Sequence, residues 1–409
     1  MGRDAAGAVT QSSENRNNRF RMESVGIACV AFAAAAFLAQ VVSVALAAWR
    51  CRKGRKRVVP LSRPAVSLVR PLSGLEPYSA ETLRSTFDIA YPSYEILFCV
   101  ADKDDPIVPL VRGLIARYPD RRATLLIGKD ALGANPKLNN MAKGFRAARF
   151  DHVVFTDSNV LLPVDYLDQI MAALQRGAGM VSAPPVGQAP EGFWAELECA
   201  FLNSYQARIQ YAVDTLGFGF AQGKTLFFRR GDLEHGGLAR LASEPAEDAA
   251  ATKMMRAMGK RIRLAGPFAQ LIGRRSFGQV WQRQVRWARL RKASFPMLFG
   301  PEILAGAVPP VLALGLGLGA LDLPWLPGSL LFMGLWYLSE LVLLRVAGWP
   351  RSLLAILLRD LLLPAIYLAG LMGSGFEWHG QKLQAESQAP DIDNVRRKPQ
   401  YRLGGYGDV

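Results

Sequence analysis

The chain has 409 residues, of which 50% are hydrophobic and 20% charged, and it carries a formal net charge of +15. This balance predicts an integral membrane protein with a basic part that faces membrane or phosphate. The basic residues are too scattered for a nucleic-acid-binding module, so no nucleic-acid partner is expected. The four cysteines are far apart and indicate neither a disulfide framework nor a zinc site, and only three histidines argue against a histidine-centred active site.

The chain begins with a polar tail and a membrane anchor. Residues 1–22 are rich in Gly, Ser, Asn and Arg and are expected to be disordered. Residues 23–50 are predicted to be a transmembrane anchor, because no charge occurs over 25–49 and this length spans a hydrocarbon core of ~30 Å at ~1.5 Å per residue. Six basic residues over 50–57 then place the following domain in the cytosol. The alternative, a signal peptide cleaved after Ala47, is disfavoured because this apolar run exceeds the usual ~7–15 residues.

Residues 62–296 are predicted to form a mixed α/β domain. Short runs rich in Val, Ile and Leu are typical of buried parallel strands. These runs lie at 66–69, 95–100, 124–127 and 152–156, with helical stretches between them at 80–87, 106–118 and 138–149. The alternation predicts right-handed crossovers and a largely parallel sheet, whose strand carboxyl ends form the ligand crevice. Asp102 follows one strand and Asp157 ends another, so both are expected there.

Residues 301–373 are predicted to form membrane helices, followed by a C-terminal tail over 374–409. The apolar stretches are 303–321, 325–344 and 353–372. The third contains Arg359, Asp360 and Pro364, and charges are expensive at a bilayer centre. With a cytosolic domain, three further crossings would export a basic tail, whereas two would keep it inside. We therefore expect two full spans and one interfacial helix.

Two aspartates at strand ends are candidates for donor binding. Asp157 is followed two residues on by Asn159, and a carboxylate with a second oxygen ligand can hold a divalent metal ion against a diphosphate. Asp after a strand is also a common turn former. Asp102 could accept hydrogen bonds from a uridine base or ribose, while Asp105 before Pro106 is typical of a helix N-cap.

The Glu247-Asp248 pair begins a helical stretch over 249–258. Carboxylates at a helix start suit the helix dipole, which is a structural explanation. The chemical alternative is a general base that takes the proton from an acceptor hydroxyl as it attacks an anomeric carbon. Such a direct displacement needs one base and one stabilised leaving group, and it inverts the anomeric centre.

A basic stretch with helical propensity, 281–292, contains Arg283, Arg286 and Trp287. The two arginines are three residues apart and share a helix face. Guanidinium groups can bind pyrophosphate oxygens through two hydrogen bonds and would stabilise a departing UDP. Trp287 could line the acceptor site. The alternative is a basic amphipathic helix that lies on anionic lipid.

Two softer signals lie between these motifs. Lys137 follows Asn135-Pro136 and could reach a phosphate, although Asn-Pro is also a plain turn. A loop with glycines at 217, 219 and 223 precedes an apolar run at 225–228 and suggests backbone close to a ligand.

In this order the motifs resemble the ceramide glucosyltransferases, glycosyltransferase family 21 of the GT-A class. The matching stretches are 66–74, 91–95, 99–106, 135–140, 157–158, 247–248 and 283–287. The resemblance covers most of the chain, from about Val66 to about Trp378. Together the motifs are far more specific than any one of them.

The resemblance implies an inverting enzyme with a nucleotide-sugar-binding, mostly parallel sheet and membrane helices at both ends. It implies transfer of glucose from UDP-glucose to the primary hydroxyl of ceramide or a related lipid, with Mg²⁺ or Mn²⁺, at the cytosolic membrane face. The family's three aspartates map onto Asp102 as the uridine contact, Asp157 as the metal site and Asp248 as the base. Its basic-aromatic signature maps onto Arg283, Arg286 and Trp287.

Two positions depart from the animal enzymes of that family. Gln206-Ala207-Arg208 aligns with their His-Pro-Arg stretch, which leaves the acceptor open. Asn159 stands where they have Gly and many glycosyltransferases have Asp, which leaves metal ligation beyond Asp157 open. The Arg- and Ala-rich composition looks bacterial, so the expected location is the bacterial inner membrane.

Three alternatives stay open. The hopanoid-associated bacterial glycosyltransferases share this layout, and the first alternative is such an enzyme with another UDP-sugar or lipid acceptor. A processive polysaccharide synthase shares the aspartates and the basic-aromatic signature, but it needs a membrane channel, for which two or three C-terminal segments are few. A basic membrane scaffold without activity is the non-enzyme alternative, and the intact Asp157, Asp248 and Arg286 argue against it.

Overall fold

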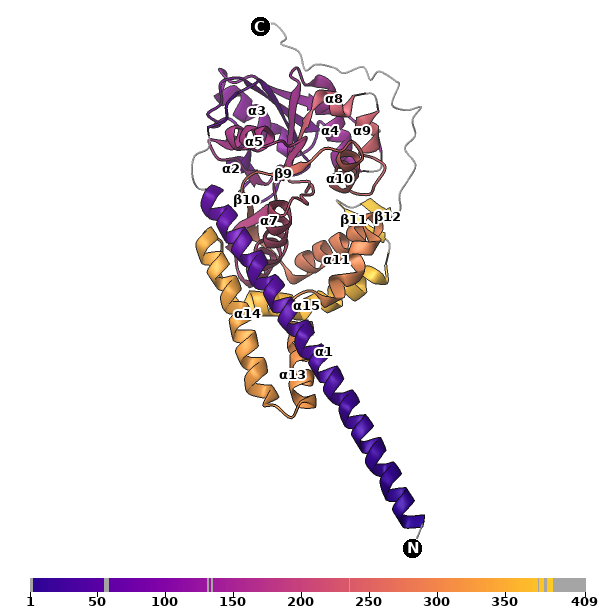
Figure 1. The fold of residues 1–409 in the computed structure, drawn as a ribbon. Coiled ribbons are helices and arrows are strands. Elements are labelled where there is room, and N and C mark those ends of the chain that lie inside the picture. Colours follow the sequence, from indigo (N-terminus) through magenta and orange to yellow (C-terminus); the bar gives the residue numbers. More distant parts are fainter. Residues whose placement is uncertain are drawn as a thin grey trace, which may run out of the picture.

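The computed structural model describes residues 3–54, 59–130, 132–133, 135–234, 236–373, 375–378 and 381–384. Figure 1 shows an α/β domain at one end of the molecule. Helices α1 (Arg3–Gly54), α13 (Val308–Ala320) and α14 (Trp325–Ala347) lie side by side at the other end. Helices α11 (Phe277–Ser294) and α15 (Leu353–Leu371) pack together between these two parts.

The main sheet of the domain is mostly parallel. Within the described residues it has seven strands in the order β3-β2-β1-β4-β8-β6-β9. Strand β1 pairs in parallel with β2 and β4, β2 with β3, and β6 with β9, whereas β8 pairs antiparallel with β4 and β6. The strands are β1 (Val66–Pro71), β2 (Tyr94–Val100), β3 (Ala123–Ile127), β4 (His152–Thr156), β6 (Met180–Ser182), β8 (Thr225–Arg229) and β9 (Ile262–Leu264). The predicted α/β domain with a largely parallel sheet is confirmed.

Helices cover both faces of this sheet, which explains why its central strands are buried and mostly apolar. All six residues of β1 are buried. On one face, Val69 packs in a cluster with Met141 of α4 (Pro136–Ala147). On the other face, Leu68 packs in a cluster with Ile170 of α5 (Tyr166–Gln175). A strand buried on both faces cannot alternate polar and apolar side chains.

The remaining helices of the domain are short and connect the strands. They are α2 (Ser79–Arg84), α3 (Ile107–Arg117), α6 (Phe193–Ala200), the π-helix η1 (Phe201–Ala207), α7 (Arg208–Thr215), α8 (Arg230–Leu233), α9 (Gly237–Arg240) and α10 (Glu247–Ala257). Helix α6, η1 and α7 are continuous in sequence and link the second sheet to the membrane helices.

A second, smaller sheet connects the domain to helix α11. Its order is β5-β10-β7, with β10 antiparallel to β5 and parallel to β7. The strands are β5 (Val160–Leu161), β7 (Pro185–Glu191) and β10 (Phe268–Arg274). Because β5 comes three residues after Asp157 and β10 leads into α11, this sheet connects the carboxyl end of β4 to the basic helix.

The structure contains helices suited to a membrane at both ends of the domain. Within the described residues, three helices are long and apolar enough to cross a bilayer: 18–52, α14 and α15. A fourth candidate is the bent pair of Pro296–Leu304, which comprises α12 (Pro296–Phe299) and η2 (Gly300–Leu304), with α13. Helix α13 is only 13 residues long, so alone it covers ~20 Å of a ~30 Å hydrocarbon core. In Figure 1, α15 runs across α1, α13 and α14 rather than alongside them. This orientation suits an interfacial helix, and the number of crossings stays a prediction.

The N-terminal tail differs from its prediction. Residues 1–22 were expected to be disordered, whereas α1 begins at Arg3 and continues to Gly54. No proline interrupts the segment, and Arg19 pairs with Glu23 one turn later at 3.1 Å. Once the apolar segment has nucleated the helix, each added residue needs only to propagate it. At the other end of the chain, the predicted tail over 374–409 lies outside the described residues except for the hairpin strands β11 (Gly375–Trp378) and β12 (Gln381–Gln384).

The charges of α15 are paired rather than exposed to lipid. Arg359 contacts Glu340 of α14 at 2.8 Å and Asp360 at 2.7 Å, and all three are buried. Gln40 of α1 donates to Glu340 at 3.1 Å. Arg208, at the start of α7, hydrogen-bonds Gln40 and so joins the domain to this network. Through these contacts one polar network connects α1, α14 and α15 to the domain.

Candidate functional site

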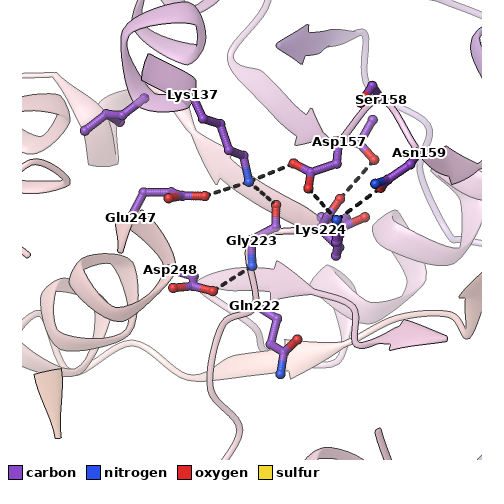
Figure 2. A network of polar contacts seen from close by, with 12 residues as sticks. Lys137, Asp157, Ser158, Asn159, Gln222, Gly223, Lys224, Glu247 and Asp248 are labelled. Carbon is purple, nitrogen blue, oxygen red and sulfur yellow. Dashed lines mark hydrogen bonds and ion pairs between the residues drawn. The ribbon is translucent and has the colours of Figure 1, made fainter. Parts of the chain in front are cut away.

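The candidate site forms where β4 ends and β8 begins. The strands pair antiparallel with Thr156 opposite Thr225, so Asp157 after β4 lies beside Lys224 before β8. The Asp157 N–H donates to the Lys224 carbonyl at 3.2 Å, and Lys224 Nζ lies 2.8 Å from Asp157 Oδ2. Figure 2 shows the two side chains turned toward each other. The β ladder therefore fixes the backbone on both sides of this ion pair.

Lys137 joins Asp157 to the start of helix α10. It lies in the first turn of α4, which Asn135 caps by accepting two backbone hydrogen bonds. Lys137 Nζ lies 2.7 Å from Asp157 Oδ1 and 2.6 Å from Glu247 Oε1, and it donates to the Gly223 carbonyl at 2.7 Å. Asn135-Pro136 is thus a helix start, and it also brings Lys137 into the site.

Charge pairing sets the protonation of these groups. Burial raises the pKa of Asp157, but the ammonium groups of Lys137 and Lys224 outweigh burial and hold that pKa below its ordinary value. Burial lowers the pKa of Lys137, but the carboxylates of Asp157 and Glu247 outweigh it and raise that pKa above its ordinary value. Both Asp157 and Lys137 are therefore ionised at neutral pH.

Asp248 lies beside the same glycine but in a different electrostatic environment. The Gly223 N–H donates to Asp248 Oδ2 at 2.9 Å, and the Ala249 N–H donates to Oδ1 at 2.8 Å. Burial and the neighbouring charge of Glu247 raise the pKa of Asp248 to about 6. A carboxylate with a pKa near 6 accepts protons better than an ordinary aspartate and is still largely ionised at pH 7.

Gly223 lets the basic and acidic groups approach its backbone closely. A Cβ at this position would lie 2.8 Å from Glu247 Oε1 and 2.9 Å from Lys137 Nζ. A larger residue would therefore push apart the groups that flank the peptide. The glycine-rich loop thus allows a close approach of side chains to its backbone, and its proximity to a ligand stays a prediction.

A buried arginine holds the loop that carries Asp157. Arg70, on β1, is fully buried and donates from Nη2 to the carbonyls of Asp157 at 2.7 Å, Ser158 at 3.0 Å and Val160 at 3.0 Å. Its Nη1 donates to the Thr82 carbonyl at 2.8 Å. Burial lowers the pKa of Arg70 to about 10, so it stays charged at neutral pH. Arg70 is a positioning residue to which the sequence analysis assigned no role, although it lies in the matching stretch 66–74.

Asn159 faces the same ammonium group as Asp157. Lys224 Nζ donates to Asn159 Oδ1 at 3.1 Å, while Asn159 Nδ2 donates to Glu76 Oε2 at 3.0 Å. Lys224 and Glu76 were also missed by sequence reasoning. The signal for Lys224 was its place between the glycine-rich loop and an apolar strand, whereas Glu76 lies in a segment without a motif.

Asp102 lies at the same sheet edge but in a separate turn. It follows β2, which is separated from β4 by β1. Its side chain is exposed and accepts a hydrogen bond from the Asp104 N–H at 3.1 Å. Asp105 Oδ1 accepts a hydrogen bond from the Ile107 N–H at 2.9 Å just before α3, but the N-cap of that helix is Pro106 rather than the predicted Asp105. The structure does not join Asp102 to the Asp157 network by direct contact.

The predicted basic-aromatic signature lies on helix α11. Arg283 forms an ion pair with Glu198 of α6, whose carboxylate is completely buried. Burial, together with the charge of Arg283, lowers the pKa of Arg286 to about 10, so Arg286 is also protonated at neutral pH. Trp287 is half-buried and packs against a cluster that includes Cys199 of α6 and residues of η1 and β10. Arg283 and Trp287 therefore contribute to the packing of α11 against α6.

Two glutamates connect the basic helix electrostatically to the Asp157 loop. Arg275 Nε lies 3.9 Å from Glu198 Oε2, on the carboxylate that also pairs with Arg283. Burial and the charge of Arg283 lower the pKa of Arg275, while the charges of Glu198 and Glu76 oppose this shift. Glu76 in turn contacts Asn159. The predicted donor-side and signature residues thus belong to neighbouring, charge-coupled groups.

The oxygen atoms around Asp157 supply some, but not all, of the ligands that a divalent metal ion needs. Asp157 Oδ2 and Asn159 Oδ1 both lie within 3.1 Å of Lys224 Nζ, so the two oxygens converge on one position. Carboxylate and amide oxygens are suitable ligands for Mg²⁺ or Mn²⁺, which prefer about six ligands. Among the described residues, no group of three or more His, Cys, Asp or Glu side chains could hold a metal ion. A metal ion here would therefore need further oxygens from a ligand such as a diphosphate.

Comparison with known proteins gives a consistent result. The family model described as Glycosyl transferase family 21 matches residues 35–390. The chain is 27% identical to Ceramide glucosyltransferase 3 of Caenorhabditis elegans over 364 residues, which cover 86% of this chain and 79% of that protein. It is 29% identical to Ceramide glucosyltransferase 1 of the same organism over 262 residues, which cover 63% of this chain and 56% of that protein.

Solved structures include a mannosyltransferase from Pyrobaculum calidifontis in complex with GDP-Man and Mn²⁺. Its TM-score to this chain is 0.46 at 20% sequence identity, and the match covers 86% of this chain and 98% of that one.

Proposed function

The chain belongs to glycosyl transferase family 21, and from this premise we propose that it transfers glucose from UDP-glucose to the primary hydroxyl of ceramide. The observation that carries the proposal is the arrangement around Gly223. A carboxylate with a raised pKa, Asp248, lies on one side of this peptide, and the Asp157–Lys137 pair lies on the other. A base and a cationic diphosphate site are the two parts that a direct displacement needs.

On the donor side, we propose that positively charged groups bind the diphosphate. Lys137 is charged and partly exposed, with 15% of its side chain accessible, so it can reach an entering phosphate. Asp157 and Asn159 would hold a divalent metal ion together with the diphosphate oxygens, and such an ion would neutralise charge on the departing UDP. Asp102, in its exposed turn at the same sheet edge, is proposed to contact the uridine.

On the acceptor side, Asp248 is the proposed base. The ceramide hydroxyl oxygen attacks the anomeric carbon of the sugar, and the bond from that carbon to the UDP oxygen breaks with its electron pair going to UDP. The hydroxyl proton passes to the Asp248 carboxylate. Because the nucleophile enters opposite the leaving group, the configuration at the anomeric carbon is inverted.

The signature helix is proposed to stabilise the leaving group. Arg286 is held in a half-buried setting, where a guanidinium group interacts more strongly with phosphate than it would in water. Arg283 is already paired with Glu198, so we propose that it orients α11 and contributes to the positive potential. Trp287 would line the acceptor site next to these charges.

The membrane helices bring the acceptor to the site. Ceramide carries two apolar chains, and extracting both from a bilayer into water is strongly unfavourable. A domain held at the bilayer surface by α1 and the C-terminal helices can accept the headgroup while the chains stay in lipid. We propose that this surface is the cytosolic face of a bacterial inner membrane.

A transfer assay tests this function. Membranes containing the protein are supplied with ceramide, a divalent metal, and labelled UDP-glucose, UDP-galactose or UDP-N-acetylglucosamine in parallel. We expect a monoglycosylated ceramide from UDP-glucose that is absent from the Asp248→Ala variant, although this variant still inserts into the membrane.

Other outcomes of the assay would correct the proposal. Product on another extracted lipid, or from another donor, would keep the reaction type but replace the substrate. Equal product from the wild type and from Asp248→Ala would contradict the assignment of the base.

A further inference from the structure

We propose that Lys224 is a resident cation at the Asp157–Asn159 pair, so that a divalent metal ion enters this position only together with a nucleoside diphosphate. The inference deepens the proposed function and rests on its use of a metal at Asp157. None of the sequence motifs includes Lys224, and the reaction as proposed gives it no role.

The first argument is geometric. Lys224 Nζ lies 2.8 Å from Asp157 Oδ2 and 3.1 Å from Asn159 Oδ1. These are the two protein oxygens that a metal ion at this loop would need, and one ammonium group contacts both. Figure 2 shows the Lys224 ammonium group joined to both Asp157 and Asn159. A metal ion can bind both oxygens only after the ammonium group has left them.

The second argument is that Lys224 is built into the site rather than placed by chance on its surface. Its carbonyl accepts hydrogen bonds from the Asp157 N–H at 3.2 Å and from Thr156 Oγ1 at 3.1 Å. Its side chain is only 18% accessible. The main chain of Lys224 is thus fixed next to Asp157, and only the flexible methylene stem separates the ammonium group from alternative positions. The stem allows the ammonium group to move without a change of backbone.

The third argument concerns charge. Asp157 has one negative charge and contacts two ammonium groups, those of Lys137 and Lys224. Glu247 shares the Lys137 ammonium group, so Lys224 is the positive charge that a dication at the Asp157 and Asn159 oxygens would meet at contact distance, and this repulsion opposes its binding. A diphosphate reverses this balance, because its anionic oxygens attract Lys224 and also supply the metal ligands that the protein lacks. Metal and diphosphate binding should therefore be strongly coupled.

The test measures metal binding directly. Full-length protein in nanodiscs of zwitterionic lipid is dialysed to equilibrium against radioactive Mn²⁺, with and without UDP, and the retained Mn²⁺ is counted. We expect the wild type to retain Mn²⁺ at Asp157 only when UDP is present. We expect Lys224→Met, which keeps the length of the stem but lacks the charge, to bind Mn²⁺ without UDP at least about tenfold more tightly than the wild type does.

Three controls make the comparison specific. Lys224→Arg keeps the positive charge and should behave like the wild type, whereas Asp157→Ala defines the Mn²⁺ retained elsewhere. Lys224→Gln is measured in parallel, and gel filtration and thermal unfolding establish which variants are folded. If Lys224→Met fails to fold, the Lys224→Gln comparison carries the test.

Two results would overturn the inference. One is equal Mn²⁺ binding by the wild type and the uncharged variants without UDP, and the other is wild-type Mn²⁺ binding that UDP does not change. The Mn²⁺-only comparison involves no sugar donor or lipid acceptor. A failure of the proposed ceramide glucosylation would therefore leave it interpretable, and a failure of this inference would leave the transfer assay unaffected.

Discussion

Asp248 is the residue whose protonation should be visible in the kinetics. Burial and the charge of Glu247 raise the pKa of Asp248 to about 6. Only the ionised carboxylate can take the proton from the hydroxyl group of the lipid. We predict that kcat/KM is constant near pH 7 to 8 and falls about tenfold per pH unit below about pH 6, rather than below the ordinary aspartate pKa of about 3.9. The measurement is a pH–rate profile with the metal and donor kept saturating.

The Asp248→Asn variant provides the comparison. It should lose about 10²–10⁴-fold in rate, the usual contribution of a general base, and its residual rate should lack the acidic limb. Asp88→Asn removes an exposed carboxylate after α2, outside the site, and should leave both the rate and the profile unchanged. An acidic limb that persists at the same pH in Asp248→Asn would assign it to another group.

At the scale of single residues, sequence motifs located the side chains proposed to react better than the residues that hold them in place. Asp157, Lys137 and Asp248 do meet around Gly223, as expected from strand ends and a helix start. Arg70 lies in the matching stretch 66–74, but its role could not be assigned from that motif, because it donates to three carbonyls of the 157–160 loop only once β1 and that loop are packed together.

At the scale of secondary-structure elements, the polar contacts of α15 explain how a charged helix can lie among apolar ones. Arg359 is buried and bonded to both Glu340 and Asp360. Removing one member of a buried ion-paired network leaves the others without compensation, which typically costs about 3–5 kcal/mol. We predict that Arg359→Met lowers the apparent Tm of the detergent-solubilised protein by several degrees. The measurement is thermal unfolding followed by intrinsic fluorescence.

Arg345 offers a matched control for this prediction. It lies in the last turn of α14 and is exposed, so Arg345→Met makes the same chemical change without opening a buried network. Its Tm should stay within about 1 °C of the wild-type value, as expected for a surface substitution. Equal losses in the two variants would show that the Arg359 network does not contribute specifically to stability.

Some secondary-structure elements could be predicted from the local sequence pattern and others could not. The strands β1 to β4 were predictable because buried parallel strands are continuous apolar runs. The helical start at Arg3 was not, because Gly, Ser and Asn have weak helix propensity in isolation and the helix is extended from an apolar neighbour. The antiparallel insertion of β8 beside β4 could not be predicted either, since it depends on a pairing between segments about seventy residues apart.

At the scale of the whole molecule, the orientation in the membrane can be tested with introduced cysteines. The four natural cysteines give little background, because three are buried and Cys29 lies half-buried in the apolar segment of α1. If the domain is cytosolic, Asp322→Cys between α13 and α14 should react with a membrane-impermeant maleimide in intact spheroplasts. Lys103→Cys, exposed on the domain, should react only after lysis.

The reverse pattern of labelling would place the domain outside. Reaction of both positions in intact cells would contradict a bilayer between them. A variant is interpretable when it is recovered in the membrane fraction at wild-type levels, because both positions lie outside the core of the domain.

The chain belongs to family 21 and combines an α/β fold with helices apolar enough to span a membrane. In the proposed mechanism, Asp248 acts as the base in a single displacement beside Gly223. The most direct measurement is the anomeric configuration of the glycolipid made by the purified protein, determined by proton NMR of the isolated product. A β-linked sugar formed from an α-linked UDP donor would be the inversion that one base and one leaving group produce. An α-linked product would require two displacements or a different mechanism, and it would contradict the role assigned to Asp248.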